Sequence, residues 1–225
     1  MINRTLAPKL KESAKQFPVV TVTGPRQSGK TTLVQSVFKN HQYVSLESPD
    51  HRRFALEDPR GFLEQFKGAV ILDEAQRAPE LFSYIQTIVD GNNDRMGRFI
   101  LTGSQNFLLL QSISQSLAGR CAVLRLLPFS MSELQSRKHA ALETLGRSSS
   151  KTPSPPEKSL LETLFAGFYP RIHDKRIPPR DWLASYYLTY IERDVRGILN
   201  VGDIESFGRF IRLCAGRSGQ LLNLS

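Results

Sequence analysis

Residues 24–31 carry the most specific chemical pattern in this sequence. They read Gly-Pro-Arg-Gln-Ser-Gly-Lys-Thr, which fits G-x-x-x-x-G-K-[ST]. An apolar run at 19–23 precedes them, and a run with helical character follows at 32–38. Such a loop between a strand and a helix points several backbone N–H groups at one anion, with the positive end of the helix behind them. The pattern therefore predicts a phosphate-binding loop and a nucleotide-binding protein.

Within this loop, the residue types predict separate contributions. The Lys30 ammonium can reach the β- and γ-phosphates, and the Thr31 hydroxyl can ligate Mg²⁺. A nucleotide with Mg²⁺ is therefore the expected ligand, and Lys30 is also expected to assist catalysis. The residues expected to contact the nucleotide are Gly24, Pro25, Arg26, Gln27, Ser28, Gly29, Lys30, Thr31 and Thr32.

A second pattern places two carboxylates at the end of a buried strand. Residues 69–72 are apolar without alternation, as in a strand covered on both faces, and Asp73 and Glu74 follow directly. Ligands of open α/β sheets bind beyond the carboxyl ends of the strands, so both acids are expected near the phosphates. We expect Asp73 to hold Mg²⁺ and Glu74 to polarise the attacking water as general base. The alternative for Glu74 is an exposed acid at a helix start.

A third short apolar run, at 99–101 within the stretch 98–105, also ends in small polar residues. We expect Ser104 to sense the γ-phosphate and the attacking water, with Thr102 and Gln105 behind it. The alternative is an ordinary turn in which Ser104 or Asn106 caps the next helix.

Two charged residues allow two interpretations each. Arg120 is a candidate arginine finger or phosphate sensor, because a planar cation can neutralise charge on a transferred phosphoryl group. A salt-bridged or solvated arginine is the alternative. Glu47 either faces the nucleotide or ends a short strand at 43–47, and we favour the strand end.

The elements that must position these residues alternate along the chain. Short apolar runs separated by amphipathic segments predict an α/β fold, a three-layer P-loop NTPase core with a parallel sheet. Asp58 is expected to cap a helix that begins at Pro59, and Ser130 or Ser132 to cap a short helix. The expected strands are 19–23, 43–47, 69–72, 98–101 and 121–126, and the expected helices of the core are 1–17, from Pro49, from Pro59, 79–90 and 106–117.

The composition changes after residue 135. Residues 136–159 are rich in serine and proline and predict a flexible linker or insert. Beyond it, the pattern predicts a small all-helical subdomain with a long helix from Asp181 to Leu199. The tyrosines and the tryptophan of that helix lie at helical spacing, which favours packing over stacking on nucleic-acid bases.

Composition excludes several classes of protein. No run approaches the ~18 apolar residues of a membrane span, and no secretory signal is visible, so a cytoplasmic protein is expected. The two cysteines and four histidines form no metal pattern. A net charge of +9 without a dense basic block is compatible with nucleic-acid contact. The sequence contains no Asn-Lys-x-Asp or Thr-Lys-x-Asp tetrapeptide, which a GTPase would need to recognise guanine. It also contains no evident acceptor-binding motif of a small-molecule kinase.

With these motifs placed, the chain resembles prokaryotic AAA+-type ATPases, in particular the group in which an ATPase core precedes a winged-helix segment and a C-terminal nuclease-like domain. Adjacent Asp73 and Glu74 resemble the branch with an additional strand and a catalytic glutamate, which implies sheet order 5-1-4-3-2. Ser104 departs from the asparagine that many AAA+ proteins carry there. The matching stretches are 24–33, 43–50, 58–63, 70–76, 100–105, 117–134 and 186–198.

The resemblance implies a domain plan: an ATPase core at 1–135, the linker at 136–159, a helical subdomain at 160–203 and the start of a truncated winged helix at 204–225. It implies ATP hydrolysis coupled to a conformational change, with DNA and further copies of the chain as candidate partners and no membrane contact. The alternative function is a nucleotide-gated DNA- or protein-binding module with little turnover.

Overall fold

A computed structural model of the chain describes residues 2–91, 95–104, 115–135, 159–190, 203–218 and 220. The chain divides into two compact units, Met1–Lys175 and Arg176–Ser225. Two predicted features lie mostly outside the described residues. They are the linker at 136–159 and the helix at 106–117. Among the described residues, no helix combines the length and apolar character that crossing a lipid bilayer requires.

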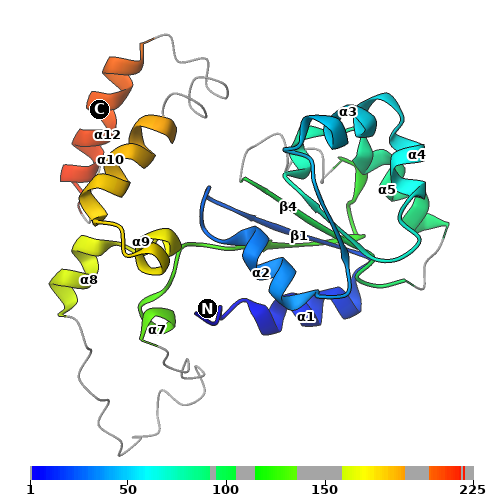
Figure 1. The fold of residues 1–225 in the computed structure, drawn as a ribbon, viewed down its shortest axis with the longest axis horizontal. Helices are drawn as coiled ribbons and strands as arrows, with labels where there is room; N and C mark the ends of the chain where they lie inside the picture. The colour runs from blue at the N-terminus through cyan, green and yellow to red at the C-terminus, as the bar shows by residue number, and fades with distance from the viewer. Residues whose placement is uncertain are drawn as a thin grey trace, which may run out of the picture. The chain divides into compact units, whose positions relative to one another are not determined.

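A five-stranded parallel sheet forms the centre of the first unit (Figure 1). Its strand order is β2-β3-β4-β1-β5, which confirms the predicted order 5-1-4-3-2 read from the other side. Strand β4 therefore lies between β1 and β3, with Gly24 paired to Ser104 and Leu72 to Leu101. The strands are β1 (Val19–Gly24), β2 (Gln42–Ser45), β3 (Val70–Asp73), β4 (Phe99–Ser104) and β5 (Cys121–Arg125).

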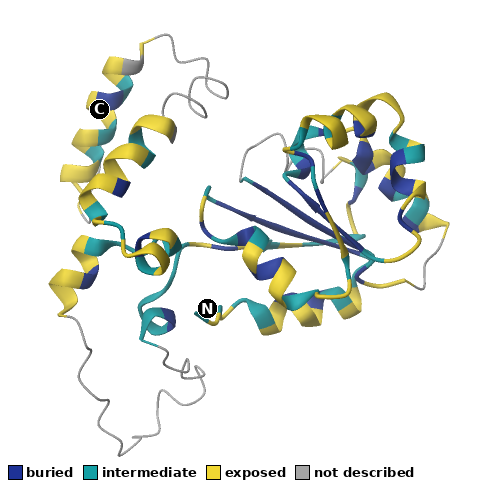
Figure 2. Ribbon diagram, in the orientation of Figure 1, coloured by how far each residue is buried: buried dark blue, intermediate teal, exposed yellow. Residues whose placement is uncertain are grey.

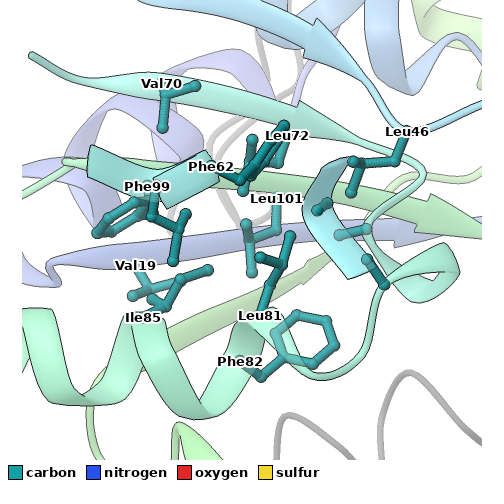
Figure 3. Packing of buried hydrophobic residues seen from close by; sticks show 14 of the residues in the cluster. Val19, Leu46, Phe62, Val70, Leu72, Leu81, Phe82, Ile85, Phe99 and Leu101 are labelled. Atoms are coloured by element: carbon teal, nitrogen blue, oxygen red, sulfur yellow. The ribbon is translucent and has the colours of Figure 1, made fainter. Parts of the chain in front are cut away.

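Helices cover both faces of the sheet, so its central strands are buried on both sides, as Figure 2 shows. One face packs against α1 (Ala7–Gln16) and α2 (Lys30–Val37), with Leu10 and Leu33 among its buried residues. The other face carries α3 (Pro49–Glu57), α4 (Pro59–Glu64) and α5 (Leu81–Asp90), and Figure 3 shows its core of Val19, Leu46, Phe62, Val70, Leu72, Leu81, Phe82, Ile85, Phe99 and Leu101. The mixed α/β, three-layer prediction is confirmed.

The local signals behave as predicted at most helix starts. The Asp58 side chain accepts a hydrogen bond from the Gly61 N–H at 2.9 Å and caps α4. Ser130 caps α7 (Met131–Leu134) in a capping box with Glu133. The expected start at Pro79 is two residues early, because Pro79 and Glu80 form a turn before α5 begins at Leu81.

Two more helices of the first unit and two of the second follow. The first unit ends with α8 (Leu160–Ala166) and α9 (Pro170–Lys175). The second contains α10 (Pro179–Tyr190) and α12 (Ile204–Gly216), joined by a hydrogen bond from the Tyr187 hydroxyl to the Gly208 carbonyl. Helix α10 begins at Pro179, close to the predicted start at or near Asp181, and proline is well suited to the first helical turn. The predicted continuation to Leu199 lies outside the described residues.

Candidate functional site

The carboxyl ends of three neighbouring strands bring the predicted site together. Strand β1 leads into the glycine loop, β3 ends at Asp73 and β4 ends at Ser104. Because all three strands are parallel, their ends lie on one edge of the sheet. The loop, the acids and the sensor residue predicted from the sequence are therefore neighbours.

Positive φ angles shape the loop backbone. Gly24 has φ +150°, Gln27 +58° and Gly29 +90°. A side chain at Gly24 is excluded for a second reason, because its Cβ would lie 2.0 Å from the Leu126 carbonyl oxygen. Gly29 then caps α2 in the left-handed conformation. This backbone lets successive N–H groups converge in front of the helix, as anion binding requires.

Lys30 lies buried beneath the loop, with a side chain held by the loop itself. Its Nζ donates to the carbonyl oxygens of Gly24 at 3.0 Å and Pro25 at 2.9 Å. Burial lowers the pKa of the Lys30 ammonium, while the nearby Glu74 and Asp73 carboxylates oppose that shift. The two acids thus compensate the charge of the lysine within the site.

The Asp73 carboxylate is the most densely hydrogen-bonded group of the site. The Thr31 hydroxyl lies 3.0 and 3.1 Å from its two oxygens, so the two predicted Mg²⁺ ligands are in contact. The Thr102 hydroxyl donates to Oδ1, and the Tyr43 hydroxyl donates to Oδ2 at 2.9 Å. Burial and the adjacent Asp73 charge raise the pKa of Tyr43 to about 12. Tyr43 therefore remains a protonated donor at neutral pH.

Glu74 and Ser104 meet through Gln76. The Gln76 Nε2 atom donates to the Glu74 Oε2 at 2.5 Å and to the Ser104 Oγ at 3.2 Å. Glu74 adopts φ +57°, a left-handed conformation that costs a non-glycine residue about 1–3 kcal/mol. The turn Ala75–Arg77 that follows turns Gln76 back toward the acid. The predicted base and the predicted sensor thus both accept a hydrogen bond from the side-chain amide of Gln76.

Arg4 supports the loop from outside. Its Nη1 donates to the Ser28 carbonyl at 2.8 Å, and its guanidinium lies 4.7 Å from the centre of the Phe129 ring. Its Nε contacts the buried Glu133 carboxylate at 3.2 Å, and that carboxylate also accepts from the backbone N–H of Thr5. The N-terminal segment therefore ties the glycine loop to the chain after β5.

Sequence reasoning missed Tyr43, Gln76 and Arg4 as members of this site. Gln76 had a usable signal, because it follows the acids by two residues within the run 70–76. Tyr43 and Arg4 had none. Their partners are Asp73 and Glu133, which lie 30 and 129 positions away in the sequence.

The structure does not bring Arg120 and Glu47 to the phosphate loop. Arg120 directly precedes β5, at the edge of the sheet opposite the loop, and its Nη2 contacts the Asp90 carboxylate at 2.9 Å. Glu47 forms an ion pair with Arg77 at 3.3 Å. Gln105 and Asn106 lie outside the described residues, so the cap alternative for Ser104 stays a prediction.

The donor atoms of the site fit a magnesium nucleotide. Thr31 and Asp73 offer hydroxyl and carboxylate oxygens, the hard ligands that Mg²⁺ prefers. The Ser28 hydroxyl is buried without a hydrogen-bond partner among the described residues, which marks an unsatisfied polar group inside the loop. The buried Lys30 ammonium supplies positive charge that phosphates need.

A parallel sheet with a glycine loop after β1 and paired acids after β3 defines a P-loop NTPase. The match to a protein family makes this more specific. Residues 16–135 match the family described as AAA domain, and the chain belongs to that family. Residues 157–225 match a family described as a domain of unknown function.

Similar proteins extend over part of the chain. Two uncharacterised proteins, Rv2008c of Mycobacterium tuberculosis and Mb2031c of Mycobacterium bovis, are each 39% identical over 126 residues. The match covers 55% of this chain and 28% of each relative, so the chain spans well under half of their length. Among solved structures, a Walker-type ATPase of Pyrococcus abyssi is 20% identical, with a TM-score of 0.43 over 59% of this chain and 55% of that one.

Proposed function

We propose that the chain is a Mg²⁺-dependent ATPase that couples ATP hydrolysis to a conformational change. The observation that carries the proposal is the contact of Thr31 with Asp73, beside Glu74 and Lys30. It joins the phosphate loop to the acids that hydrolysis needs. When bound, the Mg²⁺–ATP complex supplies the phosphoryl group and a divalent charge that polarises it.

The residues of the chain have separate roles in this proposal. Thr31 and Asp73 would hold the metal, while Thr102 and Tyr43 orient the Asp73 carboxylate. Lys30 would neutralise charge on the phosphates. These groups bind and position, and they leave the proton transfer to Glu74.

Glu74 is the proposed general base. It would accept a proton from the attacking water at a carboxylate oxygen. Gln76 holds one of those oxygens at 2.5 Å and reaches Ser104, so it would orient the carboxylate and connect it to the sensor. The strained backbone of Glu74 agrees with a functional position, because such strain concentrates at active sites.

The substitution Glu74→Gln tests the proposal. It keeps the shape of the side chain and removes the base, so phosphate release should fall by ~10² or more while ATP affinity changes little. Calorimetric titration with ATP and a steady-state phosphate assay measure the two effects. The matched control is Glu47→Gln, which removes an acid paired with Arg77 and should leave turnover unchanged. Equal turnover in Glu74→Gln and the parent would refute the assignment.

A nucleotide-gated binding module is the second candidate. It is favoured by the bond from Gln76, which holds one oxygen of the Glu74 carboxylate and so competes with a water for that acid. In that case ATP binds, but phosphate release stays at background both with and without DNA. A phosphate-release assay under both conditions separates the gated module from the ATPase.

The domain boundaries remain part of the proposal. Residues 1–135 would form the catalytic core. Residues 160–203 would form a helical subdomain, which contributes α8 and α9 to the first compact unit and α10 to the second. Residues 204–225 would begin a winged helix, with helix α12 as its first element.

A further inference from the structure

A cavity lies at the edge of the sheet opposite the glycine loop. Three segments line it: the end of α1 with Lys15, residues 67–69 before β3, and residues 95–98 before β4. Its volume is about 670 Å³, and it is widely open to solvent. Because β1 is six residues long, roughly 17 Å of sheet separates this edge from the site already described. A ligand here would not compete with the nucleotide.

Four cations line this cavity: Lys15, Lys67, Arg95 and Arg98. None of the lining residues that the structure describes carries a carboxylate. Lys15 alone has an ordinary explanation, because a lysine in the last turn of α1 complements the helix dipole. That explanation does not extend to the other three residues, which lie outside helices.

Arg98 has one buried nitrogen, Nε, without a hydrogen-bond partner among the described residues. Burial, together with the nearby Arg95 charge, lowers the pKa of its guanidinium. Its guanidinium lies 5.2 Å from the centre of the Phe99 ring, which gives no partner to the buried N–H. Two like charges close together are unfavourable unless an anion offsets them.

The backbone holds this arrangement in place. Gly97 has φ +66°, and a Cβ there would lie 2.7 Å from the Ala14 carbonyl oxygen. Its N–H donates to the Phe17 carbonyl at 2.8 Å, and the Arg98 carbonyl accepts from Val70 at 2.9 Å. The Arg95 side chain donates to the Lys67 carbonyl at 3.2 Å, which joins two of the lining segments. Hydrogen bonds and close packing therefore hold in place the backbone that carries these cations.

We infer that this cavity binds the sugar-phosphate backbone of a nucleic acid without reading its sequence. The lining has no aromatic ring on which a base could stack, so charge alone would recognise the ligand. The cations come from three separate segments, which suits successive phosphates along a strand better than one small anion. The net charge of +9 supports the same class of ligand.

Fluorescence anisotropy with a labelled duplex of about 20 base pairs, and with one of its strands, tests this inference at saturating ATP. The double variant Lys67→Gln, Arg95→Gln should bind the duplex more weakly. Its salt dependence should also be shallower, by about 1.8 in the slope of log K against log salt for two lost phosphate contacts. The control is Arg53→Gln, Arg60→Gln, which removes the same charge from exposed positions of α3 and α4.

Three outcomes would overturn the inference. They are absence of binding to either oligonucleotide by the parent, an equal loss in the two double variants, and competition by inorganic phosphate as effective as by the oligonucleotide. The variant Arg98→Gln provides a second test. It removes one cation of the lining, so affinity for the duplex should fall and the salt slope should become shallower by about 0.9. Thermal unfolding of each variant shows whether it still folds.

Discussion

The two edges of the central sheet differ in how their charges are balanced. At the carboxyl edge, Asp73 accepts three hydroxyl donors, and Lys30 contacts two carbonyl oxygens and lies near two acids. At the amino edge, Arg98 keeps a buried N–H without a partner among the described residues, in a cavity lined by cations. The carboxyl edge is internally compensated. At the amino edge Arg120 pairs with Asp90, but the described lining of the cavity contains no carboxylate.

This difference shows two ways in which a fold can prepare a binding site. Compensated charges keep side chains in place before a ligand arrives, which suits chemistry that depends on precise geometry. Uncompensated charges on a rigid backbone attract a ligand of opposite charge without requiring a particular ligand shape. Substitutions at the two edges should therefore differ in their effects on folding stability and on nucleotide binding and turnover.

The largest effect is expected from Arg4→Ala, at the carboxyl edge. Arg4 and Glu133 are almost fully buried, with side chains 9% and 3% exposed. Removing the arginine leaves a buried carboxylate without its cation, which typically costs about 3–5 kcal/mol. Urea unfolding measures the loss, and adding Glu133→Gln should recover part of it. A loss below about 1 kcal/mol would mean that the N-terminal segment does not hold the loop.

The same pair predicts a pH dependence. Burial opposes the Glu133 charge, but hydrogen bonds from Thr5 and Ser130 and the Arg4 charge hold its pKa below the usual range. A depressed carboxyl pKa stabilises the fold above the pKa of the unfolded chain, about 4.3, and that contribution is lost as the pH falls. Stability curves of the parent should therefore drop below about pH 4.3 more steeply than those of Glu133→Gln.

A smaller effect is expected from Tyr43→Phe. The change removes one of the donors to Asp73 and leaves the ring, so the Mg²⁺ concentration for half-maximal ATP binding should rise several-fold. Because the pKa of Tyr43 is raised to about 12, the folded state keeps the phenol proton. This contribution is present below about pH 10 and is lost as the pH rises toward 12. Phenolate absorbance of the parent and the variant checks the assignment, and an ordinary titration near pH 10 would contradict it.

The smallest effect is expected from Arg120→Ala, at the amino edge. Its ion pair with Asp90 is exposed, with side chains 34% and 45% accessible, and such pairs contribute about 0–1 kcal/mol. Turnover should not change, because Arg120 precedes β5 at the edge away from the loop. Phosphate release at several protein concentrations tests this, and a fall of 10² or more would instead identify an arginine finger that acts on another copy of the chain.

Much of this molecule could be predicted from local patterns. The glycines of the loop and the acids after β3 are contiguous in the sequence, and the alternation of apolar runs predicted a parallel sheet. The position of Arg120 was also open to prediction, because a residue just before a parallel strand lies at the amino edge. The sheet order came from the resemblance to a family and could not be derived from periodicity.

By itself, the sequence determined which residues meet through neighbouring positions on the chain: the glycine loop at 24–31 and the adjacent acids Asp73 and Glu74. Only the tertiary structure decided the contacts between distant segments, such as Tyr43 with Asp73, Arg4 with Glu133, and the cations from three segments at the amino edge. The physical reason is that a hydrogen bond or ion pair depends on distance in space. Sheet order and helix packing set that distance, and the local pattern of the chain does not record them.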